Sequence, residues 1–226
     1  MKEIRAKDHI LWDNLKNATV QTDPYEYIEV DLVTPEFCAL VYEELQQHFW
    51  DEYDKDSDVS NSAFAVIPKH DMNNSYAGDL QDALNTWDDW NEWYIEKFDA
   101  DLGLSHETFP RFGYQGANPE FSFTPHTDEI SDTGVHSKGL IYIHDSVGTK
   151  MFNHKLVTHH EFVDQHGDTV RNPLPEPYTE ATDEVKEVAG VGKLFMFKCT
   201  TESYHGTDFS SLNHESKRII LAGSFK

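Results

Sequence analysis

Two kinds of hydrophobic pattern divide the chain. In the second half, apolar residues alternate with polar ones at 121–124 and form mostly apolar runs of strand length at 139–144, 192–199 and 217–225. Side chains two apart on a strand share a face, so alternation and short apolar runs are both typical of β-strands. Residues 27–32 alternate in the same way. The sequence therefore predicts a core rich in strands, with one strand supplied from near the N-terminus.

Helical periodicity dominates the rest of the first half. A Thr-Pro pair at 34–35 is a typical helix start, and apolar residues three and four positions apart follow it to about Trp50. A second helix is expected from about 76 to 102. Its apolar stripe should pack against the sheet, and it consists of Leu80, Leu84, Trp87, Tyr94 and Phe98. Trp90 and Trp93 lie off this stripe, and we expect them to face a substrate cleft or a partner.

Length and composition favour one folded domain over residues 1–226. With 38% hydrophobic and 13% aromatic residues, the chain can bury a single core, and no linker rich in Gly, Ser or Pro divides it. No apolar stretch approaches the roughly 20 residues of a membrane span, and the N-terminus shows no secretory pattern. We therefore expect a cytoplasmic protein without membrane association. Cys38 and Cys199 lie in different expected elements and are interpreted as free thiols.

The acidic composition bears on partners. A formal net charge of −23 repels phosphate groups, which disfavours duplex nucleic acid as a substrate. The main interpretation is that the acidic residues form a solvated surface that keeps the protein soluble. The functional alternative is that they bind a basic protein or peptide substrate.

A His-x-Asp pair at His126 and Asp128 is the strongest chemical signal. With 13 histidines and the aspartate content of this chain, about one such pair is expected by chance, and two occur. The second, at 166–168, lies in a polar stretch with turn residues and is interpreted as an exposed loop. A His-x-Glu at 159–161 also lacks a strand pattern and is interpreted in the same way. Only the first pair lies between two strand signals, where its two side chains would point to one face.

Two histidines near the C-terminus compete to complete a metal site with this pair. His205 follows the strand expected at 192–199, whereas His214 lies in a polar turn and is the weaker candidate. Two histidines and one carboxylate form the facial triad of non-haem Fe(II) proteins. Arg218 begins the last expected strand, where a guanidinium is costly unless it meets an anion. Lys217 is the alternative base, and it faces the other side of that strand.

Taken in order, these residues resemble the catalytic half of the 2-oxoglutarate- and Fe(II)-dependent oxygenases, with a layout similar to prolyl hydroxylases. The matching features, in chain order, are His126, Asp128, Tyr142, the stretch 148–152, Gly192, Leu194, Phe197, His205 and Arg218. The resemblance covers about residues 109–226. It implies that His126, Asp128 and His205 bind iron. It also implies that Arg218 binds the distal carboxylate of 2-oxoglutarate, with Tyr142 assisting and Tyr114 as a further cofactor-binding tyrosine.

The resemblance also implies a fold and an activity. The fold is a double-stranded β-helix, or jelly roll, of about eight strands in two four-stranded sheets. Residues 1–108 would provide helices on its outer face and the first strands, and 109–226 the metal- and co-substrate-binding core. The implied activity uses Fe(II), 2-oxoglutarate and O2 to hydroxylate a peptide or small molecule, with release of succinate and CO2. The interval between Asp128 and His205 is long, so residues 154–184 are expected to form an inserted flap over the site.

Two other interpretations are open from the sequence. A cupin-like jelly roll with another metal and non-redox chemistry would keep the fold without needing Arg218. An acidic, non-enzymatic interaction protein would explain the charge and leave the triad as a coincidence.

Overall fold

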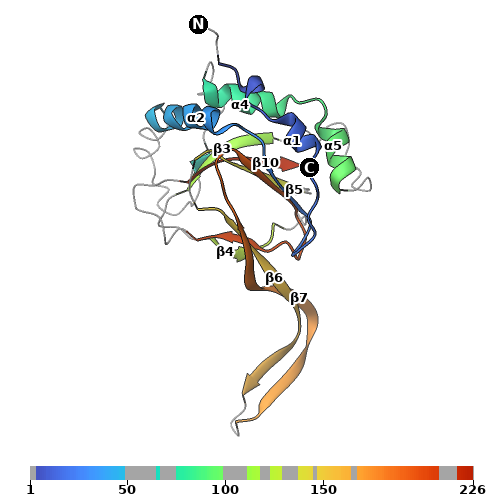
Figure 1. Ribbon diagram of the computed structural model, residues 1–226. Helices are drawn as coiled ribbons and strands as arrows, with labels where there is room; N and C mark the ends of the chain where they lie inside the picture. Colours follow the sequence, from blue (N-terminus) through green and yellow to red (C-terminus); the bar gives the residue numbers. More distant parts are fainter. Residues whose placement is uncertain are drawn as a thin grey trace.

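The computed structural model places the chain in a mostly β fold with two antiparallel sheets and helices on one side (Figure 1). It describes residues 4–48, 65–66, 75–98, 111–117, 123–128, 137–144, 147–163, 167–208 and 218–225. The larger sheet has six strands in the order β1 (Tyr27–Asp31), β8 (Lys193–Lys198), β5 (Ser137–Tyr142), β10 (Arg218–Phe225), β3 (Arg111–Ala117) and β2 (Ala65–Val66). The smaller sheet has four, in the order β4 (Phe123–His126), β9 (His205–Thr207), β6 (Thr149–Val163) and β7 (Thr169–Val188).

The jelly-roll prediction is confirmed, with an addition at each edge of the larger sheet. Strands β8, β5, β10 and β3 form one four-stranded sheet of the core, and β4, β9, β6 and β7 form the other. Strand β1 pairs with β8, and β2 pairs with β3, which brings the larger sheet to six strands. The expected strands near 27–32, 139–144, 192–199 and 217–225 are present as β1, β5, β8 and β10.

Helices cover the outer face of the larger sheet, as expected (Figure 1). They are η1 (Ala6–Asp8), α1 (Trp12–Lys16), α2 (Pro35–His48), α4 (Tyr76–Asn85) and α5 (Trp90–Phe98). Their apolar side chains form one buried cluster with alternate residues of the sheet, including Ile141, Leu194 and Ile219. This helix-side core anchors one face of the sheet, so the other face is left to pack against β4, β9, β6 and β7.

The expectation of one helix from 76 to 102 is wrong within the described residues. Helix α4 ends at Asn85, where the Thr86 hydroxyl donates to the carbonyl of Asp82, and α5 begins only at Trp90. Short polar side chains bond to nearby backbone groups and so favour helix ends over helix interiors. Residues 99–102 lie outside the described part of the chain.

The break turns two tryptophans inward, so the expectation that Trp90 and Trp93 face a cleft or partner is also wrong. Both are buried in the helix-side core. Their indole N–H groups donate to the carbonyls of Leu84 at 2.6 Å and Leu15 at 2.9 Å. The interruption rotates the apolar face of α5 relative to that of α4. A single 3.6-residue periodicity applied across 76–102 therefore assigned Trp90 and Trp93 to the wrong face.

Strands β6 and β7 form a long hairpin whose distal part projects from the body (Figure 1). The loops expected around the His-x-Glu at 159–161 and over 169–172 are therefore corrected to strand, although His159 and Glu161 are exposed as expected. Gly167 and Asp168 of the second His-x-Asp pair are exposed and lie outside the strands, as expected. The three prolines between 173 and 177 fit because the register jumps there, from Val157 opposite Tyr178 to His159 opposite Pro173. Cross-strand pairing supplies structure that no local pattern indicates.

Two composition-based expectations can be compared with the fold. Cys38 and Cys199 are buried, free thiols, which confirms that prediction. Within the described ranges, no helix has the length and apolar character that crossing a membrane requires.

Candidate metal centre

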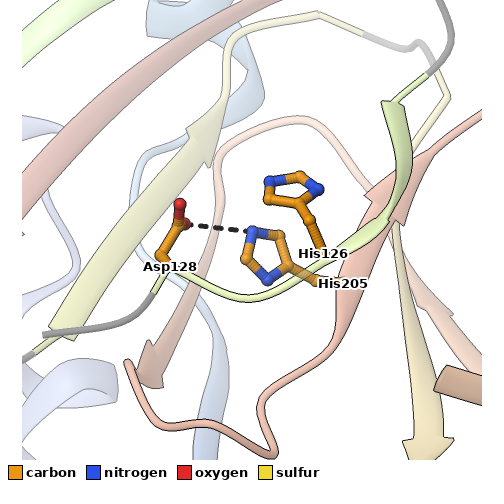
Figure 2. Close-up of side chains that lie close together, drawn as sticks. All are labelled: His126, Asp128 and His205. Carbon is orange, nitrogen blue, oxygen red and sulfur yellow. Dashed lines mark ion pairs between the residues drawn. The ribbon is translucent and has the colours of Figure 1, made fainter. Parts of the chain in front are cut away.

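The three expected ligands meet on the smaller sheet. His126 ends β4, His205 begins β9, and the two residues are direct partners in the antiparallel register of these strands. Their rings lie 4.5 Å apart between centroids. Asp128 follows two residues after β4 ends and points back toward both rings (Figure 2). One ligand atom from each residue lies within 4.8 Å of the others.

Both imidazoles are oriented by backbone carbonyls. His126 Nδ1 lies 2.9 Å from the carbonyl oxygen of Thr124, and His205 Nδ1 lies 3.0 Å from that of Ser203. A carbonyl oxygen only accepts hydrogen bonds, so each Nδ1 carries the proton and donates it. This leaves Nε2 of each ring facing the site, where His205 Nε2 contacts the Asp128 carboxylate, and a metal that binds there takes the place of any proton on Nε2.

The carboxylate is held ionised. Its Oδ2 lies 3.1 Å from His205 Nε2 and 2.8 Å from Lys138 Nζ. Burial of Asp128 opposes ionisation, but the hydrogen bonds and positive charge of His205 and Lys138 outweigh it and hold the pKa of Asp128 well below its usual value. Burial, together with neighbouring His205, lowers the pKa of His126. At neutral pH the centre therefore offers a carboxylate and unprotonated imidazole at His126, and such donors suit a divalent transition metal.

Arg218 lies buried on the inner face of the larger sheet, with 3% of its surface exposed. Its Nη2 donates to the Thr149 hydroxyl at 2.8 Å, and its guanidinium carbon lies 5.5 Å from the centre of the Tyr142 ring. The Tyr142 hydroxyl donates to the same Thr149 oxygen at 2.8 Å. Burial lowers the pKa of Arg218 and raises that of Tyr142, because both charged forms lose solvation.

The pairing of this buried cation is incomplete, and Glu187 acts on it only from beyond ion-pair distance. Among the described residues, no carboxylate forms an ion pair with Arg218, and its buried Nε has no hydrogen-bond acceptor. Burying an unpaired guanidinium costs free energy, so an anion that enters here is strongly favoured. The donors Nε and the Nη groups form a planar fork that matches a carboxylate.

The metal centre and the arginine are connected through β6. Thr149, which contacts Arg218, lies two residues before Met151 on the same face of that strand. Met151 pairs directly with His205. The two sites are thus joined by about 7 Å of strand and by the aromatic inner core, where the Phe197 ring lies 4.6 Å from His205.

The remaining expected residues differ in how far they can be placed. Tyr142 lies on the inner face beside Arg218. Tyr114 lies on β3, where its backbone pairs with Leu221, and its side chain lies outside the described part. His214 and Lys217, the two alternatives, also lie outside the described residues.

Two polar residues at the site were not expected from the sequence. Lys138 contacts the Asp128 carboxylate, and Thr149 joins Arg218 to Tyr142. The signal for Lys138 was available, because a period of two back from Tyr142 places positions 140 and 138 on the same face. The signal for Thr149 was not, since its role depends on which strand lies opposite β10.

Comparisons with known proteins bear on the fold alone. No protein-family model matches the chain, and no curated protein matches its sequence. Among solved structures, the chain is similar to a crystal structure of a Pseudomonas putida prolyl-4-hydroxylase, with a TM-score of 0.51 and 15% sequence identity over 95% of each chain. At that identity the likeness supports a shared jelly-roll architecture, and the chemistry has to be argued from the residues of this chain.

Proposed function

We propose that this chain is an Fe(II)- and 2-oxoglutarate-dependent dioxygenase that hydroxylates a peptide or a small molecule. The observation that carries the proposal is the coincidence, in the interior between the two sheets, of an oriented His-Asp-His set and a buried arginine that forms no ion pair with the described residues and leaves Nε unbonded. Either feature alone has a simpler explanation. Together they provide for a divalent metal and a carboxylate in one region of the fold.

The donor set fits iron. His126 and His205 each present Nε2, and Asp128 presents an ionised oxygen, so the residues would hold a divalent ion at three positions. A metal bound in this way keeps further positions open. Lys138 would retain its hydrogen bond to the carboxylate and so fix its orientation.

The arginine fits a dicarboxylate co-substrate. Arg218 would receive the distal carboxylate on Nε and its Nη groups, with the Thr149 and Tyr142 hydroxyls beside it. Iron and 2-oxoglutarate, when bound, would supply the oxidising chemistry, in which O2 and 2-oxoglutarate give succinate, CO2 and a hydroxylated C–H bond. The protein's part is to orient the co-substrate and to keep bulk water away from it by the aromatic side chains of Phe195 and Phe197.

The substrate class is proposed more broadly. The solved structure with a similar fold is described as a prolyl-4-hydroxylase. A peptide is therefore one candidate, and a small molecule is the other.

Binding can be tested before any substrate is known. Anaerobic titration of the metal-free protein with Fe(II) and then with 2-oxoglutarate should produce the weak visible charge-transfer band of an iron–oxoacid complex. The His126→Ala variant should lose the band, because one of three ligands is removed. His159→Ala is the matched control, since that histidine is exposed on β6 and should leave the band unchanged.

Turnover completes the test. Wild-type protein with Fe(II), 2-oxoglutarate and O2 should release succinate, and a peptide and metabolite panel should increase that release for the true substrate class. A wild-type protein without the band, or a His126→Ala variant that keeps it, would contradict the proposal. A protein that binds a metal at this centre but does not respond to 2-oxoglutarate would favour the cupin-like alternative.

A further inference from the structure

The distal part of the β6–β7 hairpin carries most of the exposed apolar surface that the structure describes. Six large apolar side chains are exposed in the described part of the chain, and five of them lie on this hairpin: Leu156, Phe162, Val163, Tyr178 and Val185. Isolated two-stranded ribbons are marginally stable in water. A projecting ribbon with exposed apolar residues is therefore a candidate for strand addition.

The two edges of this ribbon are not equivalent. Strand β7 has prolines at 173, 175 and 177, which lack the N–H that a neighbouring strand needs. Strand β6 has no proline, and among the described strands its outer edge pairs with β9 only at Lys150 and Met151. With respect to the described strands, the edge of β6 from 155 to 163 is thus open and able to pair, whereas the edge of β7 is blocked.

We propose that two copies of this chain associate through the open edge of β6, in an antiparallel arrangement about a two-fold axis at Thr158. The result is one continuous four-stranded ribbon in the order β7, β6, β6, β7. In this register, Thr158 lies opposite Thr158 of the partner subunit. Position 155 of each chain lies opposite position 161 of the other chain. The association does not depend on iron or 2-oxoglutarate.

Charge complementarity selects this register. Within one chain, Lys155 pairs with Glu180 at 2.7 Å, and Glu161 pairs with Arg171 at 2.7 Å, each across directly opposed positions. Joining the two ribbons at Thr158 places Lys155 opposite Glu161 of the partner subunit. Each of two symmetric rows then reads Glu180, Lys155, Glu161 and Arg171, with alternating sign across four strands. Opposite charges across strands are favourable, and like charges are unfavourable.

Apolar contacts accompany the charges on the other face of the ribbon. Leu156 and Phe162 share that face, because both are even-numbered positions on β6. In the proposed register, Leu156 lies diagonal to Phe162 of the partner subunit, within reach of an aromatic side chain. This contact occurs twice by symmetry, and it covers two of the five exposed apolar residues.

A second copy explains these observations better than an extended peptide does. A peptide would satisfy the edge but would not account for the self-complementary order of charges around Thr158. The protein carries a net charge of −23, which opposes association of the bodies. Contact along the projecting ribbons keeps the two bodies at opposite ends of the joined ribbon, and repulsion over more than about 8 Å is screened at physiological salt.

Paired charge swaps test the register while preserving each ribbon. The variant Lys155→Glu/Glu180→Lys keeps its own cross-strand ion pair but places a glutamate opposite Glu161 of the partner subunit. The variant Glu161→Lys/Arg171→Glu likewise keeps its own pair but places a lysine opposite Lys155 of the partner subunit. Each should weaken dimerisation by about tenfold or more in sedimentation velocity runs over a concentration series, because attraction is replaced by repulsion at two positions.

Mixing the two variants is the decisive step. In a mixed dimer, the glutamate that replaces Lys155 in one chain faces the lysine that replaces Glu161 in the other, and the native residues at these positions face each other as before. Association should therefore return to the wild-type level. Failure of the mixture to recover, or variants that dimerise alone as well as wild type, would overturn the register. A wild-type protein that remains monomeric at every concentration would overturn the proposal and leave the edge to an extended peptide.

A single cysteine provides an independent readout. Thr158→Cys should form a disulfide-linked dimer under mild oxidation, because the two-fold axis places the two cysteines opposite each other. Asn153→Cys is the matched control and should not cross-link, since its counterpart lies ten positions away along the paired strands. The native Cys38 and Cys199 are buried and should contribute little background. Equal cross-linking of both variants would also contradict the proposal.

Discussion

The two faces of the larger sheet are both buried, yet they differ in chemistry. Strand β10 contributes Ile219 and Leu221 to the helix-side core, and Arg218 and Ile220 to the inner face. The helix-side core is a continuous apolar cluster that includes the buried Trp90. The inner face combines aromatic rings with a buried tyrosine hydroxyl, a threonine and a guanidinium whose Nε has no hydrogen-bond partner.

The difference shows how one strand provides stability and function on opposite sides. On the helix side, the buried indole N–H groups of Trp90 and Trp93 are bonded to backbone carbonyls, so the burial of these two large side chains leaves neither donor unsatisfied. On the inner face, Arg218 leaves Nε without a partner. A buried polar group of this kind lowers stability until a ligand satisfies it. Apolar burial on the helix side is thus expected to offset the loss of folding stability that the buried Arg218 causes on the inner face.

Substituting adjacent residues on β10 gives the largest expected effects and separates the two roles. Arg218→Met should reduce 2-oxoglutarate affinity by about 2–5 kcal/mol, because the co-substrate carboxylate loses its charged partner. The same change should leave the free energy of unfolding equal or higher, since an uncompensated buried charge is removed. Calorimetric titration and urea unfolding measure the two quantities.

Ile219→Ala is the matched variant on the opposite face. It should lower the free energy of unfolding by about 2–5 kcal/mol through lost burial and cavity formation. Affinity of the folded protein for 2-oxoglutarate should not change. If Arg218→Met destabilised the fold as much as Ile219→Ala and kept its affinity, the two faces would not differ as described.

Lys138 tests whether the inner face orients the metal ligands as well as the co-substrate. Lys138→Met should weaken Fe(II) binding by about 10–100-fold, because Asp128 loses the hydrogen bond that fixes its carboxylate. Lys150→Met is the control, since Lys150 pairs with Glu184 and does not contact the metal centre. Tighter metal binding in Lys138→Met would instead show that the lysine competes with the metal for Asp128.

The smallest effect concerns the acid stability of the metal-free protein. The pKa of Asp128 is held below its usual value of 3.8, so its ionised form stabilises the fold. That contribution is fully present above pH 3.8 and is lost as the pH falls through the folded-state pKa. The difference in unfolding free energy between wild type and Asp128→Asn should therefore be constant from about pH 7 to about pH 4 and shrink below that. A difference that grew toward low pH would contradict the assigned environment of Asp128.

Local patterns were sufficient for the strands and for selecting the three residues that the structure brings together in the candidate metal centre. Strong apolar runs indicated β5, β8 and β10, because burial between two layers requires apolar residues on both faces. The His-x-Asp pair was identified by its position between two strand signals. The helix break at Thr86 and the inward turn of Trp90 were missed, since one polar cap changes the phase of everything that follows it.

The sequence by itself determined which residues are suited to bind a metal and an anion, and that the core is built mainly of strands. Only the tertiary structure decided that His126 and His205 are direct partners across β4 and β9. It also decided that Thr149 joins Arg218 to Tyr142, and that residues 154–163 and 169–184, expected as parts of an inserted flap, pair as two long strands. The physical reason is the same in each case: side-chain chemistry and periodicity are local properties of the chain, whereas strand register is set by contacts between segments far apart in sequence.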